Sequence, residues 1–225
     1  MRAKNAPLSR KKRLVAALFR SHSALLDRMN RVPLFVNYIR CNPNSLIFED
    51  RLALYRHINR RIGDVPINYL EFGVHQGESI RQWSSLNRNP ASRFVGFDSF
   101  EGLPEAWDYL DKGAFSTGGQ LPTIADNRVS FVPGWFQDTL DGFLHDFMPR
   151  GRIVINNDSD LYSSTLYTLT KLDHLLVSGT IVIFDEFDDV QHEFRAMQDY
   201  VAAYRKNLRL LGGNNRFRTA AFEVV

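Results

Sequence analysis

The sequence predicts one α/β domain whose sheet is mainly parallel, with one antiparallel strand near the C-terminus. Apolar β-type runs alternate with helical segments through most of the chain, and this alternation is typical of a parallel sheet with helices on both faces. The last two runs, residues 208–211 and 219–225, are separated by the glycines and asparagines of residues 212–215. That spacing predicts a hairpin, and therefore a strand that runs against the others.

Length and composition agree with a single folded domain. At 225 residues the chain is long enough for one such domain and short for two. A hydrophobic content of 44% with 12% aromatic residues supports a packed core. Cys41 is the only cysteine, which excludes an internal disulfide and a cysteine-based zinc site and fits a reducing, cytoplasmic location.

The net charge of +3 is unevenly distributed along the chain. Residues 1–31 carry nine Lys and Arg and a single acid, Asp27, whereas residues 32–225 carry 19 basic and 24 acidic residues. The basic character therefore belongs to the N-terminus, and this distribution gives no support to a nucleic-acid-binding protein. We divide the chain into a basic N-terminal arm with helices, residues 1–60, and a main domain, residues 61–225.

The N-terminal arm allows two interpretations. Its apolar run, residues 14–19, is too short to span a membrane and lacks a clear small-residue cleavage site, so we predict neither a transmembrane segment nor a signal peptide. A helix with one apolar face could instead lie on an anionic membrane surface; that face would comprise Leu14, Leu18, Leu25 and Met29. Alternatively, the arm is solvated, packs in a homo-oligomer or shapes the acceptor pocket.

Two segments connect the arm to the main domain. Pro33 and Pro43 lead us to expect an extended connection over residues 31–44. The spacing of apolar residues then predicts a helix over residues 45–61.

The first strand of the main domain, residues 67–73, leads into a glycine loop. Gly73 and Gly77 allow a tight turn and a close approach of the backbone to a ligand. A helix that begins near Ser79 would direct its N-terminus at the same place. The spacing is not the G-x-G-x-x-G pattern of dinucleotide-binding proteins, and a glycine pair alone also fits an ordinary turn.

The second strand, residues 93–97, ends in Asp98 and Ser99. An acid at this point typically binds ribose hydroxyls, and capping of a helix is the alternative. Residues 100–120 form a long irregular loop rich in glycine and aromatic residues, as in lids and binding loops. Further along the chain we expect a strand over residues 129–132 and helices over residues 139–147, 165–177 and 192–206.

Two later strands, residues 152–155 and 180–184, are each followed by carboxylates. The acids are Asp158 and Asp160 after the first of these strands, and Asp185 and Glu186 after the second. Ligands bind at the carboxyl edge of open α/β sheets, and an oxygen-rich site there suits a hard divalent cation. The alternative is that the acids cap the helices that follow. Asp160, which is followed by Ser163, Ser164 and Thr165, is the acid that we expect to cap the next helix or to hold the loop.

Five motifs carry a resemblance to the class I S-adenosylmethionine-dependent methyltransferases, and in particular to the macrocin O-methyltransferase family. They are EFGVHQGES (residues 71–79), DSFEGLP (98–104), GWFQDTL (134–140), DSDLYSST (158–165) and FDEF (184–187). The resemblance implies the Rossmann-like class I methyltransferase sheet. It also implies Mg²⁺-dependent methylation of a sugar hydroxyl of a natural product by S-adenosylmethionine.

The resemblance further implies roles for individual residues. The implied cofactor-binding residues are Glu71, Gly73, Gly77 and Ser79 at the methionine end, Asp98 and Ser99 at the ribose, and Trp135 and Phe136 near the adenine, where an aromatic ring offers a stacking face. The implied metal ligands are Asp158, Asp185 and Glu186. Glu186 stands where the family usually has a second Asp, so the charge is kept but the side chain is longer.

These observations lead to a hypothesis of methyl transfer from S-adenosylmethionine to the hydroxyl of a glycan or of another small-molecule acceptor. An alcohol is a weak nucleophile near neutral pH, and Mg²⁺ or another divalent cation would activate it. Asp158 would accept the proton, with His75 and His145 as rival bases. The alternatives are an O-methyltransferase of a non-sugar, catechol-like molecule and a nucleotide-binding partner protein without methyl transfer.

Overall fold

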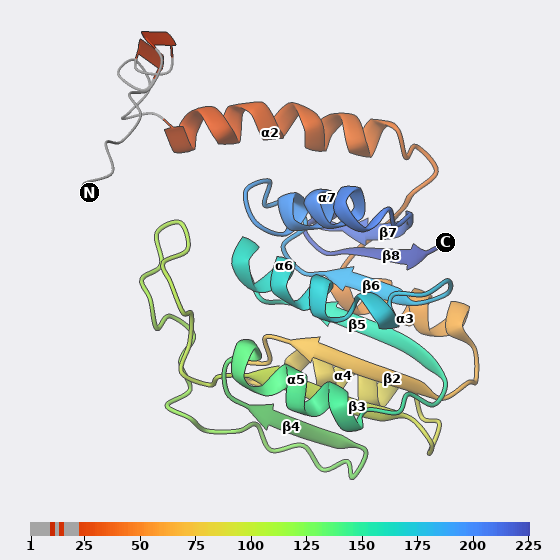
Figure 1. Cartoon of the computed structure of the whole chain (residues 1–225). Coiled ribbons are helices and arrows are strands. Elements are labelled where there is room, and N and C mark those ends of the chain that lie inside the picture. The colour runs from red at the N-terminus through yellow and green to blue at the C-terminus, as the bar shows by residue number, and fades with distance from the viewer. Residues whose placement is uncertain (1–9, 12–13, 16–22) are drawn as a thin grey trace.

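A computed structural model describes residues 10–11, 14–15 and 23–225, and an eight-stranded sheet lies at its centre (Figure 1). The strand order is β1-β7-β8-β6-β5-β2-β3-β4. The strands are β1 (Leu46–Phe48), β2 (Ile67–Phe72), β3 (Arg93–Asp98), β4 (Val129–Pro133), β5 (Arg152–Asn157), β6 (Ile181–Phe184), β7 (Leu208–Asn214) and β8 (Ala220–Val224).

Strand directions confirm the predicted sheet. From β6 through β5, β2 and β3 to β4, each strand pairs in parallel with the next, and β1 pairs in parallel with β7. Only β8, among the strands in the described part of the chain, runs the other way, because it pairs antiparallel with both β6 and β7. A mostly parallel sheet with an antiparallel C-terminal strand is therefore confirmed.

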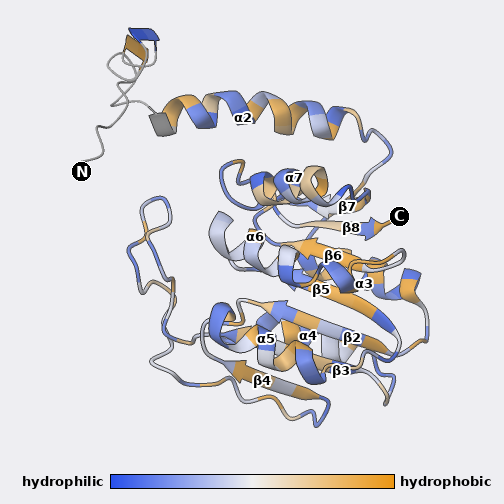
Figure 2. Cartoon of the chain, viewed as in Figure 1, coloured by the Kyte–Doolittle hydropathy of each residue, from blue (hydrophilic) through white to orange (hydrophobic). Residues whose placement is uncertain are grey.

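Helices cover both faces of the sheet, as predicted. One face packs against α5 (Phe136–Asp146), α6 (Tyr162–Lys171) and α7 (Glu193–Tyr204), and the other against α3 (Arg51–Ile62) and α4 (Glu78–Leu86). Side chains along each strand alternate between the two cores: Leu70 of β2 packs with the first set of helices, and Tyr69 packs with the second. The central strands are apolar along most of their length (Figure 2), as expected for strands covered on both sides.

The prediction of an extended connection over residues 31–44 is wrong. A long helix, α2 (Ser23–Arg40), runs through most of this segment and contains Pro33. Its inner side packs on the first core: the ring of Phe35 meets Phe194 edge-on, with the ring centroids 5.2 Å apart, and Tyr38 contacts the same ring. Because most helical stability comes from such packing, a single exposed proline does not end the helix.

The prediction of one helix over residues 45–61 is also wrong in its first turn. Leu46–Phe48 forms the edge strand β1, and α3 begins only after Asp50, whose side chain accepts a hydrogen bond of 2.6 Å from the backbone N–H of Ala53. This bond is a typical N-cap. Residues 46–62 thus pack with the same sheet and core as the rest of the domain.

The turn before the last strand lies later than predicted. Gly212 and Gly213 continue β7 and pair with Leu46 and Ile47 of β1. A Cβ atom on Gly212 would lie 2.6 Å from the carbonyl oxygen of Leu46, so glycine is needed for close pairing rather than for the turn. The chain turns instead in the short 3₁₀ helix Asn215–Phe217, and a second such helix, Asp173–Leu175, follows α6.

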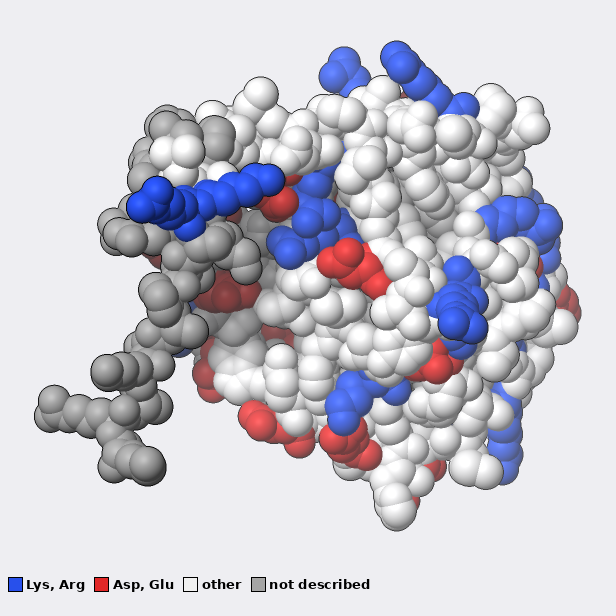
Figure 3. All heavy atoms as spheres, turned by 45° about the horizontal axis from the view of Figure 1, so that its top comes forward, with Lys and Arg blue, Asp and Glu red and all other residues white. Residues whose placement is uncertain are grey.

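The predicted amphipathic helix around Leu14 and Leu18 lies partly outside the described residues. No helix among residues 10–11, 14–15 and 23–225 is both long and apolar enough to cross a membrane. On the face shown in Figure 3, Lys and Arg side chains are spread over the surface and acidic side chains lie among them.

One buried carboxylate ties four elements together away from the carboxyl edge of the sheet. Glu223 of β8 accepts hydrogen bonds from Arg61 of α3 (2.8 Å), from Arg152 of β5 (3.0 Å) and from Arg209 of β7. Burial raises the pKa of Glu223, but the hydrogen bonds from Arg209 and Arg61 outweigh it and hold the pKa below its ordinary value of 4.5.

We predict that Glu223→Gln lowers the free energy of unfolding at pH 7 by about 2 kcal/mol, because three guanidinium groups lose a charged partner. The stabilisation by the ionised carboxylate is present above pH 4.5 and is lost as the pH falls through the lowered pKa. The difference between wild type and variant should therefore shrink below pH 4.5, as measured by urea unfolding. Asp141→Asn, which removes an exposed ion pair with Lys171, is the control and should cost under about 0.5 kcal/mol. An equal loss in both variants would contradict the prediction.

Candidate active site

A cavity lies at the carboxyl edge of the sheet, at the point where the strand order reverses. From β2 the chain builds β3 and β4 on one side, and then returns to place β5 on the other side of β2. Ligands of open α/β sheets bind at such a switch point. The cavity has a volume of about 810 Å³ and receives residues from the ends of β2, β3, β5 and β6.

The loops that follow β2 and β5 touch at this point. Gly73 takes φ +90°, and a Cβ atom on it would lie only 1.7 Å from the carbonyl oxygen of Asp158. In turn, the backbone N–H of Asp158 donates to Phe72 at 2.8 Å. Gly77 takes a left-handed conformation just before α4. Glycine is therefore required at residue 73 so that the first loop can lie against the start of the acidic segment.

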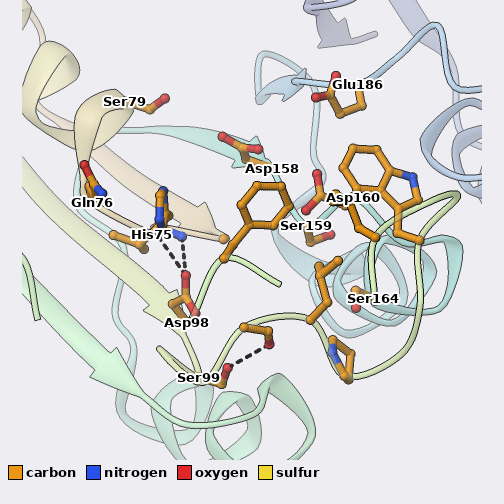
Figure 4. Close-up of a pocket in the computed structure, with 18 of the residues that line it drawn as sticks. His75, Gln76, Ser79, Asp98, Ser99, Asp158, Ser159, Asp160, Ser164 and Glu186 are labelled. Atoms are coloured by element: carbon orange, nitrogen blue, oxygen red, sulfur yellow. Dashed lines mark hydrogen bonds between the residues drawn. The ribbon is translucent and has the colours of Figure 1, made fainter. Parts of the chain in front are cut away.

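Asp98 joins the glycine loop to the loop after β3. One of its oxygens accepts hydrogen bonds from the backbone N–H groups of Val74 and His75, both at 2.8 Å, and the other accepts from Phe100 at 2.7 Å (Figure 4). A carboxylate offers about four acceptor sites. About one site therefore remains for a ligand hydroxyl.

Carboxylates gather at the other end of the cavity, where Asp158, Asp160 and Glu186 lie close together (Figure 4). Asp158 lies 3.9 Å from a guanidinium nitrogen of Arg51. The same nitrogen, Nη1, is 3.0 Å from Asp185. Arg51 is thus the common partner of the acids that end β5 and β6.

Burial, together with repulsion between the acids, shifts their pKa values upward. Burial, followed by repulsion from Asp185, raises the pKa of Asp158 well above its usual range. Burial and repulsion from Glu186 raise the pKa of Asp160 to about 7. Burial also raises the pKa of Glu186 to about 7, although a 2.5 Å hydrogen bond from Arg218 opposes the shift. Groups that titrate near neutral pH suit proton transfer.

The predicted capping role of Asp160 is wrong. The N-cap of α6 is Leu161, and no side chain makes a cap hydrogen bond there. Asp160 instead takes φ +60°, an uncommon conformation for a residue with a side chain, and its side chain lines the cavity. In the described structure its carboxylate makes no hydrogen bond or ion pair with another side chain.

The side chains do not form the predicted metal site as they are arranged. In the described part of the chain no group of three His, Cys, Asp or Glu side chains is placed to hold a metal ion. The reason is that these carboxylates already have cationic partners. Arg51 lies between Asp158 and Asp185, and Arg218 forms an ion pair with Glu186.

The loop between β3 and β4 forms one wall of the cavity and supplies aromatic side chains from Trp107, Tyr109 and Phe115. The indole N–H of Trp107 donates to Asp189, in the β6–α7 loop, at 3.1 Å. The ring of Phe115 contacts His75 of the glycine loop, with the ring centroids 5.9 Å apart. The loop therefore reaches across the cavity from its own strand ends to the far side, as a binding loop would.

Eleven residues were predicted for the site, and eight of them line this one cavity. The eight are Gly73, Ser79, Asp98, Ser99, Trp135, Phe136, Asp158 and Glu186. Gly77 and Asp185 lie next to lining residues without lining the cavity themselves.

Glu71, the remaining residue, is buried and hydrogen-bonded to Tyr69 and Asn156. Burial raises its pKa to about 8, so it is mostly protonated at neutral pH. His75 lines the cavity, whereas His145 lies on the surface of α5.

Arg51 and Arg218 line the cavity but were missed by sequence reasoning. Arg51 begins α3, more than 100 residues before Asp158, and Arg218 lies in the last turn. Neither belongs to a motif, and only the fold brings them to the acids.

Comparisons with known proteins point to one family. The profile of the macrocin-O-methyltransferase (TylF) family matches residues 43–210. A rhamnosyl-tetracenomycin-C 4'-O-methyltransferase from Streptomyces olivaceus is 32% identical over 58% of this chain and 59% of its own length. The demethyldecarbamoylnovobiocin O-methyltransferase of Streptomyces niveus is 38% identical over 70% of each chain. This chain thus spans less than two thirds of the first of these relatives.

Among solved structures, the calicheamicin methyltransferase CalS11 superposes with a TM-score of 0.62 at 25% identity, covering 97% of this chain and 94% of that one. Its apo form, described as a TDP-rhamnose 3'-O-methyltransferase, has a TM-score of 0.56. With three quarters of its length matched by the family profile, and the same fold as CalS11, this chain belongs to the macrocin O-methyltransferase family.

Proposed function

We propose that this protein is an S-adenosylmethionine-dependent O-methyltransferase that acts on a sugar hydroxyl. The observation that carries the proposal is that Asp98, at the end of β3, lines the same cavity as the acids that follow β5 and β6. Family membership supports methyl transfer. A sugar acceptor is supported by the names of two relatives, which specify a rhamnosyl group and TDP-rhamnose.

The residues at one end of the cavity fit the proposed cofactor. Asp98 keeps acceptor capacity for a ribose hydroxyl beyond its three backbone bonds. Trp135 and Phe136 offer aromatic surface for the adenine, and the loop after Gly73 leads into the N-terminus of α4. A cavity of about 810 Å³ lies within the range of small-molecule sites.

The acids at the other end supply the proton acceptor. Bound S-adenosylmethionine would provide an electrophilic methyl group, and the acceptor hydroxyl must lose its proton as the new C–O bond forms. Asp158 is the base that the sequence predicts. Asp160 is a second candidate, because its pKa is about 7 and its carboxylate is free of partners in the described structure, whereas Asp158 lies 3.9 Å from Arg51.

We derive no step through Mg²⁺. The side chains of Asp158, Asp185 and Glu186 are paired with arginines and do not fit a metal ion as they stand. Binding of a divalent cation therefore stays a prediction from the sequence. A homo-oligomer, a cytoplasmic location and contact of the basic N-terminus with a membrane also stay predictions.

The cofactor proposal is tested by calorimetry. We predict that the wild type binds S-adenosylmethionine and that Asp98→Asn weakens binding at least tenfold, through loss of a charged acceptor. Asp126→Asn is the control, because Asp126 also anchors a loop through backbone and side-chain bonds to Arg128 but lies outside the cavity. It should destabilise the fold without changing cofactor affinity. Absence of binding to the folded wild type would refute the methyltransferase proposal.

The acceptor class is tested by measuring release of S-adenosylhomocysteine with a panel of acceptors. We predict turnover with rhamnosides or a nucleoside-diphosphate rhamnose and at least a hundredfold lower kcat/KM with catechol. A preference for catechol would still support methyl transfer, but it would contradict the proposal that the acceptor is a sugar.

The proton acceptor is tested by replacing each candidate with asparagine. We predict that Asp160→Asn lowers kcat at least a hundredfold, in line with the loss of a general base, and more than Asp158→Asn does. A base must be deprotonated to act, so kcat of the wild type should fall as the pH drops below about 7. The affinity for S-adenosylmethionine serves as the control and should not change. A larger loss in Asp158→Asn would instead support the assignment made from the sequence.

A further inference from the structure

Arg51 is held in place by the fold rather than by a flexible loop. It is the first residue of α3, directly after the N-cap Asp50. The helix is anchored in the core by Leu54, Tyr55 and Ile58, which are fully buried. The guanidinium of Arg51 therefore extends from a fixed helix end into the cavity.

That guanidinium lies where the predicted metal ligands converge. Its Nη1 atom is 3.0 Å from Asp185 and 3.9 Å from Asp158, and its Nη2 atom is 3.5 Å from Glu78 at the start of α4. The side chains of Arg51, Asp185 and Asp158 are 25%, 13% and 27% exposed, so solvent screens their interaction only in part. One guanidinium of the chain thus contacts the acids of two strand ends.

A divalent cation and the guanidinium compete for the same oxygens. Mg²⁺ needs carboxylate oxygens at 2.0–2.1 Å, and Asp158 and Asp185 cannot both approach an ion that closely while Arg51 remains between them. Arginine does not lose its proton in proteins, so its charge can leave the site only if the side chain moves.

We propose that Arg51 is the resident cation of this site and that a divalent metal ion binds between Asp158 and Asp185 only by displacing it. The consequence for catalysis rests on the proposed function, but the competition itself can be measured without turnover. It gives the N-terminal part of the chain a direct role in setting the affinity of the site for metal.

The test measures the binding of Mn²⁺ to chelator-treated full-length protein by electron paramagnetic resonance. We expect Arg51→Gln to bind Mn²⁺ at least tenfold more tightly than the wild type. Arg81→Gln is the matched control: Arg81 lines the same cavity from α4 and the charge change is identical, but no acid is recorded as its partner in the described structure. Its Mn²⁺ affinity should stay within twofold of the wild type. Equal affinities of wild type and Arg51→Gln would overturn the proposal.

Further measurements on these variants separate metal binding from effects on folding. Without metal, Arg51→Gln should melt at a lower temperature than the wild type, because its acids lose their cation, and Mn²⁺ should raise its melting temperature more than that of the wild type. Adding Asp158→Asn to Arg51→Gln should abolish the gained Mn²⁺ binding; retained binding would place the metal elsewhere and contradict the proposal.

If Arg51→Gln does not fold, Arg51→Lys, which keeps the charge without the planar fork, should show an intermediate affinity. Calorimetry with S-adenosylmethionine on the same samples separates failure of this inference from failure of the proposed function.

Discussion

The contact between Gly73 and Asp158 is the constraint on which the site depends. The strands β2 and β5 lie side by side at the centre of the sheet, and their hydrogen bonding continues one residue past β5, where Asp158 donates to Phe72. Only a residue without a Cβ atom fits beside the carbonyl of Asp158. This close approach joins the glycine loop, and through it Asp98, to the segment that carries the acids.

A second constraint is electrostatic, because the acids at this edge must be compensated. Arg51 and Arg218 supply the compensating charges. The buried carboxylate of Glu193 on α7 adds a further acid, which accepts hydrogen bonds from the side chain of Asn157 (3.1 Å) and from the backbone N–H of Glu186 (2.8 Å). It therefore joins the ends of β5 and β6. Asn157 is held in addition by Thr165 and Thr168 of α6. The acids thus follow strand ends that are held by buried hydrogen bonds, so their position is set by the fold even though their charges repel.

The central sheet and one side of the site could be predicted from the sequence because they depend on local patterns. Apolar runs that end in Asp98 or Asp158 indicate both a strand and the edge at which it ends. The failures have a common physical cause, since they concern residues whose structure is decided by distant partners. The helix α2 persists through Pro33 because Phe35 and Tyr38 pack on α7. Likewise, Arg51 acquires its role only because β1 and α3 fold back beside β7.

The loop between β3 and β4 shows how an acceptor could reach these acids without disturbing the cofactor side. Its base is closed and buried: the carbonyl of Phe100 accepts from Thr117 (3.2 Å) and Gly119 (3.0 Å), and Phe100 is 1% exposed. Its tip, by contrast, reaches α6 and the β6–α7 loop (Figure 1) through the bond from Trp107 to Asp189 and an exposed bond from Ser163 to Glu105.

Partly or fully exposed hydrogen bonds contribute little net stability, so local opening of the tip would cost much less than global unfolding. Asp98 is bonded to Phe100 in the closed base and to Val74 and His75 in the glycine loop, so its backbone bonds would persist when the tip moves. The same loop therefore has a rigid half beside the proposed cofactor site and a weakly held half that lines the cavity with the acids. This division suits a site that must keep one ligand oriented while it admits another.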